Sequence, residues 1–300
     1  MRFSEDRLAT LDCGPQAQRQ IHIWDAPGGV APRAVILAIH GGLAHGGDYV
    51  TPALYFRAHG ITTVAYDLCG HQNARRVDIP NFQVFLDDSV RFLQWIKQQW
   101  PGVPVFVMGH SMGALIATHL ALGAFANESA IQGFILSSPY YVNALKVSPV
   151  LLALAGVLGA LAPRMKVPLE PMTDVLTHDA AITARHHADE RDGIRASECT
   201  VRFGNALQGA QAGLAARMAG WRHPLFAVVA GDDKLADARA SEAMLRAIDP
   251  ALLTLQIQPQ NYHENFNEVN REQIFDDILG WIAARLPTSA STRTASSATI

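Results

Sequence analysis

The sequence of 300 residues predicts an α/β fold, in which a mostly parallel central sheet carries helices on both faces and one inserted helical lid. Short apolar runs rich in β-branched residues alternate with longer helical patterns, as in βαβ units with right-handed crossovers. The alternation breaks once, between residues 140 and 222, and that stretch is far longer than an ordinary connection. The length suits one large domain that can bury a substantial core.

Six continuous apolar runs are the predicted parallel strands, because a strand that is buried on both faces shows no polar alternation. They are Ala34–Ile39, Ile61–Tyr66, Val103–Met108, Ile131–Leu136, Leu225–Ala230 and Leu252–Ile257. Before them, Arg7–Asp12 and Gln20–Trp24 are predicted to form an antiparallel pair at the edge of the sheet.

Helical spacing of apolar residues fills the intervals between these runs. The predicted helices cover Phe82–Trp100, Ser111–Phe125, Ser241–Ile248 and Asn270–Leu286. Residues 1–139 and 223–286 would then form the two parts of the core, with residues 1–19 the least defined. Residues 140–222 would form the helical insertion, and the Ser/Thr/Ala-rich tail 287–300 is expected to be disordered.

The insertion begins at the carboxyl end of a predicted strand, which is the edge of an α/β sheet where ligands bind. This position predicts a lid. Within the insertion, Val150–Ala162 is apolar on nearly every face, which fits either a buried helix or a lid helix that lines an acyl pocket and transiently contacts a lipid surface. The side chains expected in that pocket are Leu151, Leu154 and Leu158, with Tyr140 and Tyr141 at its rim.

Charge and composition exclude several kinds of protein. Lysine and arginine number 24 and aspartate and glutamate 27, so the formal net charge is −3, which leaves no basic field for nucleic acid. The three cysteines, Cys13, Cys69 and Cys199, have no metal-site or disulfide spacing. Because we find no Gly-x-Gly-x-x-Gly after a strand, no Walker loop and no His-Glu-x-x-His, we predict no metal, nucleotide or flavin cofactor.

Two features of the sequence bear on its location. The N-terminal residues MRFSEDRLAT are charged and lack the apolar stretch of a secretory signal. The longest apolar run, Val150–Ala162, is shorter than the roughly 20 residues that cross a bilayer. We therefore expect a cytoplasmic protein, peripheral at a membrane at most, and the sequence indicates no oligomeric state.

The strongest chemical signal is the segment Gly109-His110-Ser111-Met112-Gly113, a Gly-x-Ser-x-Gly motif. It follows a predicted strand and opens a predicted helix, which is the context of a nucleophilic serine on a tight turn. The two glycines allow the turn, and the helix N-terminus offers free N–H groups to a developing oxyanion. A chance match on a surface loop would lack this placement.

A serine nucleophile needs a base and an acid that orients the base, in the chain order Ser, Asp or Glu, His. Of the histidines that follow the serine, only His263 lies in a loop between the last predicted strand and the last predicted helix. The acid should follow the strand Leu225–Ala230, where three aspartates compete: Asp232, Asp233 and Asp237. Spacing does not choose between Asp232 and Asp233.

An oxyanion hole needs two backbone N–H groups. One belongs to Met112, the residue after the nucleophile. The second is expected from the loop His40–Gly47, whose glycines let the backbone approach a substrate closely. A flexible loop without a ligand is the alternative.

Together these motifs resemble the monoacylglycerol lipase and lysophospholipase group of α/β hydrolases, which belongs with the serine aminopeptidase-like hydrolases. The resemblance extends over roughly residues 20–286. The matching segments are His40-Gly41 with His45 and Tyr49, Gly109–Gly113, Asp233-Lys234-Leu235-Ala236-Asp237 and Tyr262–Glu268. The resemblance implies a triad of Ser111, Asp233 and His263, with Gly42 and Met112 as the oxyanion hole.

Two segments depart from the family pattern. Leu43-Ala44-His45 replaces Gly-Glu-His, and Asp67–Ala74 lacks the second glycine and the serine of the corresponding family segment. In the family, that second segment shapes the rear of the pocket. His45, His71 and His110 are expected to be structural hydrogen-bonding residues rather than reacting groups.

The resemblance also implies an activity: hydrolysis of a small-molecule acyl ester with a lipid-like alcohol, a monoacylglycerol or a lysophospholipid, through an acyl-enzyme. Because one fold supports many chemistries, two alternatives stay open. The first is a general carboxylesterase or thioesterase that acts on short acyl esters. The second is an α/β-hydrolase-like protein that only binds a ligand. The intact triad argues against this second alternative.

Overall fold

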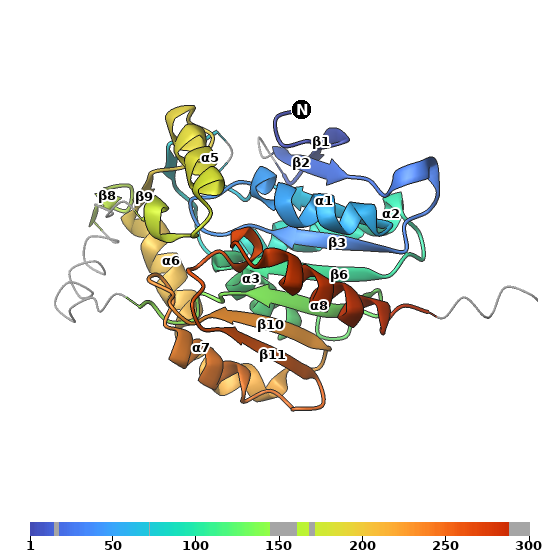
Figure 1. Cartoon of the computed structure of the whole chain (residues 1–300). Coiled ribbons are helices and arrows are strands. Elements are labelled where there is room, and N and C mark those ends of the chain that lie inside the picture. The colour runs from blue at the N-terminus through green and yellow to red at the C-terminus, as the bar shows by residue number, and fades with distance from the viewer. Residues whose placement is uncertain (15–17, 72, 145–160, 168–171, 288–300) are drawn as a thin grey trace, which may run out of the picture.

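The computed structural model describes residues 1–14, 18–71, 73–144, 161–167 and 172–287, and its centre is an eight-stranded sheet with the order β1-β2-β4-β3-β6-β7-β10-β11 (Figure 1). The strands are β1 (Arg7–Asp12), β2 (Gln18–Trp24), β3 (Ala34–Ile39), β4 (Ile61–Tyr66), β6 (Val105–His110), β7 (Ile131–Ser137), β10 (Leu225–Ala230) and β11 (Leu253–Gln258). The pairs β1–β2 and β2–β4 are antiparallel, and the later pairs are parallel. The predicted strands are therefore confirmed, with end shifts of at most two residues.

Helices cover both faces of this sheet, as predicted (Figure 1). One face carries α1 (Val50–Ala58) and α8 (Arg271–Ala283), and the other carries α2 (Gln83–Gln99), α3 (Met112–Ala121) and α7 (Ala238–Leu245). Of these, α1 is a helix that we did not predict. Its Pro52 lies in the first turn, where a missing N–H costs no helical hydrogen bond, so the proline that weakens the sequence signal is compatible with the helix.

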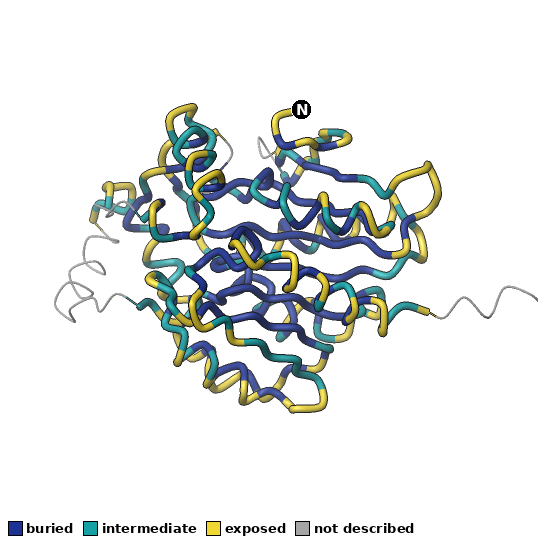
Figure 2. Tube along the Cα trace, in the orientation of Figure 1, coloured by how far each residue is buried: buried dark blue, intermediate teal, exposed yellow. Residues whose placement is uncertain are grey.

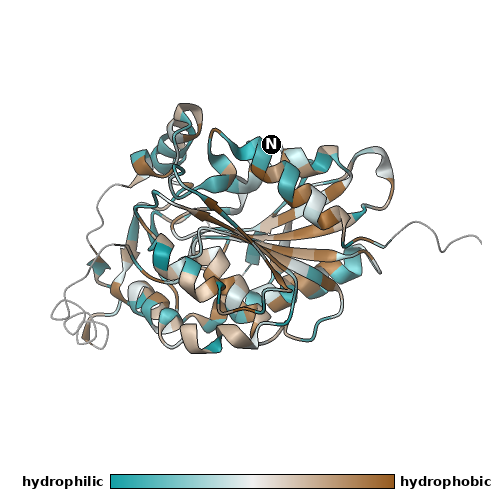
Figure 3. Cartoon of the chain, turned by 60° about the horizontal axis from the view of Figure 1, so that its bottom comes forward, coloured by the Kyte–Doolittle hydropathy of each residue, from teal (hydrophilic) through white to brown (hydrophobic). Residues whose placement is uncertain are grey.

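Side chains alternate across the sheet and build two hydrophobic clusters. Val35, Leu37 and Ile39 of β3 join the cluster beneath α2 and α3, whereas Ala34, Ile36 and Ala38 join the cluster beneath α1 and α8. Figure 2 shows the central strands buried and the outer sides of the helices exposed, and Figure 3 shows hydrophobic residues gathered on the strands. Burial on both faces explains why the strands show continuous apolar runs.

The insertion lies between β7 and β10, two neighbouring parallel strands. Its described elements are β8 (Lys166–Val167), α5 (Ala180–Arg191), β9 (Glu198–Thr200) and α6 (Val201–Gln211). A second sheet of order β5-β9-β8 joins it to the core, because β5 (Arg76–Val77) precedes α2 in the chain. The apolar run Val150–Ala162 lies almost wholly outside the described residues, and so do Leu151, Leu154 and Leu158.

Short 3-10 helices occupy several of the connections. They are η1 (Pro27–Gly29), η2 (Gly46–Tyr49), η3 (Thr173–Val175), η4 (Ala215–Gly220) and η5 (Asn265–Asn267). Of these, η2 and η5 lie in the loops after β3 and β11, which contain His40–Gly47 and His263. Among the helices that the structure describes, none combines the length and the apolar character needed to cross a membrane.

Candidate active site

Ser111 occupies a sharp turn between β6 and α3. Its backbone has φ 54° and ψ −117°, a left-handed conformation that L-residues rarely adopt. The flanking glycines are required by close packing, since a Cβ at Gly113 would lie 1.9 Å from the carbonyl oxygen of Ile39 and one at Gly109 would lie 2.5 Å from that of Gly113. The motif therefore forms the strained strand-to-helix turn that its sequence predicts.

His263 and Asp233 form a hydrogen-bonded pair. His263 Nδ1 lies 2.7 Å from Asp233 Oδ2, and the two side chains are 3% and 2% exposed. The other carboxylate oxygen accepts the backbone N–H groups of Leu235 and Ala236 at 2.8 and 3.0 Å. Burial acts to raise the pKa of Asp233, but the charge and hydrogen bond of His263 and these two amides together lower it below the ordinary value.

The structure also separates the two aspartates between which spacing did not choose. Asp232 forms an ion pair with Lys234, and its side chain is half exposed. Asp233, in contrast, faces His263 and forms no ion pair with a lysine in the described part of the chain. Because β10 and β11 are parallel neighbours, the loops that follow them meet at one edge of the sheet, and this brings Asp233 and His263 together.

The serine and the histidine lie at the same edge, although no hydrogen bond joins Ser111 Oγ to His263 Nε2. The ring of His263 packs against the ring of His110, the residue before the serine, with 4.8 Å between their centroids. His263 Nε2 is buried and has no hydrogen-bond partner among the described residues. Hydrogen bonds between nucleophile and base are often long without substrate, so this geometry is compatible with a base that engages the serine later.

Gly42 and Met112 face each other. A Cβ at Gly42 would lie 3.9 Å from Met112 Sδ. The backbone N–H groups of Gly42 and Met112 make no hydrogen bond within the described residues, so both remain available to an oxyanion. The neighbouring Leu43 adopts φ 61°, which shows that this loop is held in a restricted conformation.

Phe203 is a residue near the site that the sequence analysis did not identify. It lies on α6 of the insertion, is buried, and places its Cζ 4.0 Å from a Cβ at Gly42. No motif marks it, because only tertiary packing brings α6 next to the loop after β3. The insertion therefore contributes an aromatic wall to the position expected for the oxyanion hole.

The two tyrosines expected at a pocket rim differ in their surroundings. Tyr141 is buried, and its hydroxyl lies 2.7 Å from Thr118 Oγ1 on α3, so its ring belongs to the core. Tyr140 is only partly buried, and its backbone N–H donates to the carbonyl oxygen of Ser111 at 3.2 Å. Tyr140 thus lies beside the turn that carries Ser111.

Three buried histidines surround the site in a neutral form. The backbone N–H of Leu68 donates to His40 Nε2 at 2.9 Å, so the Nδ1–H of His40 donates to the carbonyl oxygen of Gly41 at 2.7 Å. Burial, aided by the neighbouring His71, lowers the pKa of His40 to about 3. Burial likewise lowers the pKa of His71 to about 4, and burial together with His263 lowers the pKa of His110 to about 3.

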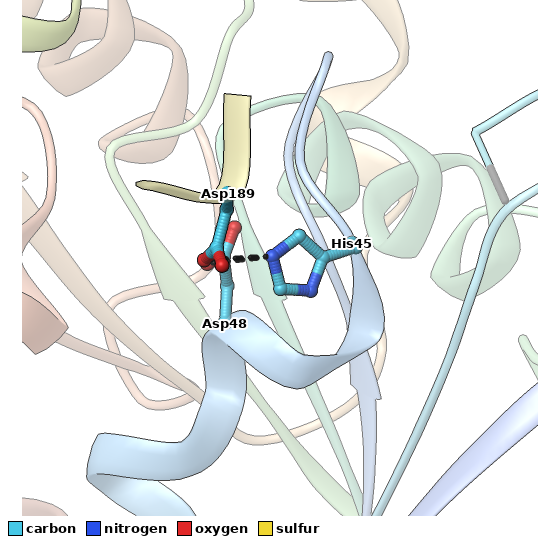
Figure 4. Close-up of side chains that lie close together, drawn as sticks. All are labelled: His45, Asp48 and Asp189. Atoms are coloured by element: carbon cyan, nitrogen blue, oxygen red, sulfur yellow. Dashed lines mark hydrogen bonds and ion pairs between the residues drawn. The ribbon is translucent and has the colours of Figure 1, made fainter. Parts of the chain in front are cut away.

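One cluster has the residue types of a metal site. The side-chain ligand atoms of His45, Asp48 and Asp189 all lie within 4.8 Å of one another (Figure 4). However, Asp48 Oδ2 pairs with Arg195 at 2.6 Å and Asp189 Oδ1 pairs with Arg2 at 2.6 Å. Because these arginines already balance the two carboxylates, a divalent cation would add uncompensated positive charge, and we assign the cluster to ion pairing.

One surface hollow in the described part of the chain lies away from the turn that carries Ser111. Its volume is about 510 Å³, and it is lined by residues of α2, α3 and α6, including Phe82, His119 and Ala206. The candidate site itself is closed, because Ser111 is 8% exposed and His263 is 2% exposed. Substrate access therefore requires that residues which cover Ser111 and His263 move.

The fold and this site define a hydrolase with the α/β-hydrolase fold, which confirms the predicted fold class. The chain belongs to the family described as serine aminopeptidase, S33, whose sequence model matches residues 30–270. It is similar to the monoacylglycerol lipase of Mycolicibacterium smegmatis, with 32% identity over 259 residues that cover 85% of this chain and 90% of the relative. It is also similar to phospholipase YtpA of Bacillus subtilis, with 30% identity, covering 81% and 93%.

A solved structure agrees with the fold. A soluble variant of monoglyceride lipase from Saccharomyces cerevisiae, in complex with a substrate analog, superposes with a TM-score of 0.81 at 21% identity and covers 94% of this chain and 96% of that one. The resemblance stated from the motifs is therefore confirmed. These matches make the chain an enzyme of the carboxylic ester hydrolase class.

Proposed function

We propose that this enzyme hydrolyses the acyl ester of a lipid-like small molecule, a monoacylglycerol or a lysophospholipid, through an acyl-enzyme on Ser111. The observation that carries the proposal is the buried Asp233–His263 pair, which lies beside a strained serine turn and leaves Nε2 of the histidine without a hydrogen bond to any residue that the structure describes. An unpaired buried nitrogen is costly to maintain, and a proton acceptor for a serine hydroxyl has this arrangement.

In the proposed mechanism, His263 Nε2 takes the proton of Ser111 as Oγ attacks the ester carbonyl. Asp233 accepts the Nδ1–H, which fixes the tautomer and stabilises the imidazolium that forms. The N–H groups of Gly42 and Met112 stabilise the tetrahedral oxyanion. His263 then protonates the leaving alcohol, and water attacks the acyl-enzyme with the same residue as base.

The lipid-like substrate is supported by the apolar surroundings of the serine. Met112 and Phe203 lie against Gly42, and both side chains are buried in the larger hydrophobic cluster. An acyl chain next to these groups would be held by apolar contact. The similar enzymes from M. smegmatis and B. subtilis are named a lipase and a phospholipase. We further propose that residues 140–222 act as a lid over this site.

A short acyl ester or thioester is the second candidate, and one observation favours it. A Cβ at Gly42 would already lie 4.0 Å from Phe203 Cζ, so the space beside the proposed oxyanion hole is narrow in this structure. The cytoplasmic location and a transient lid contact with lipid stay predictions.

The test uses purified enzyme and its Ser111→Ala variant. We expect the wild type to be labelled by a fluorophosphonate and to hydrolyse monoacylglycerol or lysophospholipid, and we expect the variant to do neither while it unfolds at the same urea concentration. A series of p-nitrophenyl esters distinguishes the two substrate classes, since activity confined to acetate would favour the short-chain candidate. Retained turnover by Ser111→Ala would contradict the mechanism.

A further inference from the structure

Two loops must keep their relative positions for the proposed reaction, the loop after β3 with Gly42 and the loop after β11 with His263. Arg195 of the insertion contacts both loops, and so does its neighbour His186, which lies 3.7 Å from Asp48 Oδ1 and 2.8 Å from Glu264 Oε2. Arg195 Nη1 donates to Asp48 Oδ2 at 2.6 Å, and Asp48 belongs to η2 at the end of the first loop. Arg195 Nη2 donates to Glu264 Oε1 at 3.4 Å, and Glu264 directly follows His263.

This bridge is enclosed by protein. The side chains of Arg195 and Glu264 are each 7% exposed, and that of Asp48 is 11% exposed. In such surroundings a charge-assisted hydrogen bond is stronger and more directional than on the surface. The planar guanidinium also fixes the directions of its donors, so the pairing restricts orientation as well as distance.

His186 of α5 completes the arrangement. Arg195 Nη1 donates to His186 Nδ1 at 3.2 Å, so the opposite Nε2–H donates to Glu264 Oε2 at 2.8 Å. Burial acts to raise the pKa of Glu264, but the hydrogen bond from His186 and the charge of Arg195 outweigh it and hold that pKa well below the ordinary value. Glu264 is therefore an ionised carboxylate that is held on both oxygens, and Asn267 Nδ2 adds a third donor at 2.7 Å.

The backbone next to Arg195 also contacts the first loop. The N–H of Ala196 donates to the carbonyl oxygen of Leu43 at 3.0 Å. Leu43 adopts the positive φ described above and directly follows Gly42. A strained residue keeps its conformation only where its surroundings impose it, and this hydrogen bond is one such restraint. The segment Arg195-Ala196 thus contacts the first loop twice, once through a side chain and once through the backbone.

We propose that Arg195 is a positioning residue, which sets the position of His263 relative to Gly42 by pairing with Glu264 and Asp48 at the same time. The inference rests on the proposed function, because it assigns a purpose to the spacing between base and oxyanion hole. Arg195 does not reach the reacting atoms, so its effect passes through the two loops. Small displacements of reacting groups reduce rates steeply, which is why such a bridge would matter.

The experiment compares Arg195→Met, Arg195→Lys and Arg19→Met, with steady-state kinetics on the best p-nitrophenyl ester. Arg19 is a matched control, because its side chain is 9% exposed and pairs at 2.8 Å with the buried Asp88, away from both loops. We expect Arg195→Met to lower kcat by about 10²-fold with KM changed by less than about threefold. Arg195→Lys should recover part of kcat, because a lysine can pair with one carboxylate but not hold both.

Arg19→Met should leave kcat within about twofold of the wild type while lowering the urea midpoint as much as Arg195→Met does. If the two methionine variants have the same kcat, or if lysine recovers nothing, Arg195 is only a structural residue and the inference fails. Active wild type and inactive Ser111→Ala in the same assay show that the proposed function stands independently of that outcome.

Hydrogen exchange gives a second readout that does not depend on turnover. In Arg195→Met, the amides of residues 41–48 and 262–268 should exchange faster together, whereas in Arg19→Met neither segment should change. Unchanged exchange of both segments in Arg195→Met would overturn the inference even if activity were lost. A wild type that shows no esterase activity would refute the proposed function, and the exchange comparison would still decide whether Arg195 restrains the loops.

Discussion

Acid should destabilise this protein in a pH range where its carboxylates are still ionised, because three buried histidines are held neutral. The pKa of His40 and of His110 is lowered to about 3, and that of His71 to about 4, against an ordinary value of 6.5. Above about pH 6.5 these groups are neutral in both the folded and the unfolded chain. As the pH falls below 6.5, these histidines become protonated in the unfolded chain but stay neutral in the folded chain. The free energy of unfolding therefore decreases.

The magnitude follows from the size of the shifts. Each pH unit in this window costs about 1.4 kcal/mol for each histidine. Between about pH 7.5 and about pH 5, each histidine therefore removes about 2 kcal/mol, and the three together remove about 6 kcal/mol from the free energy of unfolding. A domain of ordinary stability has about 5–15 kcal/mol in total, so the loss is large.

Burial also lowers the pKa of His119, which adds to the effect in this window, whereas other groups oppose it or act at lower pH. Burial acts to lower the pKa of His22, but the hydrogen bonds and charges of Asp67 and Glu5 raise it overall, so His22 gains some stability as the pH falls. Carboxylates with lowered pKa, such as Asp233, lose their contribution only below about pH 4. The net expected loss is therefore about 4–6 kcal/mol.

Urea unfolding followed by fluorescence at both pH values measures this loss. His71→Asn isolates one histidine, since the asparagine amide can replace the bond from His71 Nδ1 to the carbonyl oxygen of Cys69 at 3.0 Å. The variant should show a pH-dependent loss about 2 kcal/mol smaller than the wild type, whereas His59→Asn, at an exposed position, should show the same loss as the wild type. Equal losses in His71→Asn and the wild type would refute the reasoning.

Four substitutions, one of them a control, test the packing and the Asp233–His263 pair at the site. Gly113→Ala should lower the free energy of unfolding by about 3 kcal/mol, because its Cβ would lie 1.9 Å from a carbonyl oxygen, whereas Gly204→Ala in α6, with nothing within 4 Å, should raise it by about 0.5–1 kcal/mol. Equal urea midpoints would contradict this contrast. Asp233→Asn should lower kcat about 10⁴-fold without changing the urea midpoint, and a loss below tenfold would argue against its role as the orienting acid. Tyr141→Phe should cost about 1 kcal/mol of stability through the lost hydrogen bond to Thr118 and leave the ester chain-length preference unchanged, and an altered preference would place Tyr141 in the pocket after all.

The sheet and the candidate catalytic residues could be predicted because each depends on local sequence. A strand buried on both faces needs a continuous apolar run, and Ser111 and Asp233 follow such strands, whereas His263 follows the partly buried edge strand β11. The choice between Asp232 and Asp233 could not be made from spacing, since both follow β10. The choice depends on which of the two side chains faces the loop after β11. Parallel pairing of β10 with β11 brings that loop alongside, and the contact with His263 is made by Asp233.

The insertion was harder to predict because its contacts are long-range. Arg195 and Phe203 lie in no recognisable motif, and their partners Asp48 and Gly42 lie far earlier in the chain. A buried ion pair between residues that are distant in the chain leaves no periodic pattern in the sequence from which it could be predicted. The sequence offers one indirect indication of a buried ion pair. Only 17% of the residues are charged, yet the acidic Glu264 lies directly beside the expected catalytic histidine.

The position of the insertion has a consequence for the kinetics of folding. The parallel pair β7–β10 joins β10 and the edge strand β11 to the rest of the sheet, yet its two strands are separated in sequence by the whole insertion, from Ser137 to Leu225. Ser111 precedes this gap, whereas Asp233 and His263 follow it. Closing so long a loop is entropically slow, so helix and β1–β7 signals should recover early on dilution from denaturant. Ester hydrolysis should return in a later phase, when β10 pairs with β7 and β11 pairs with β10.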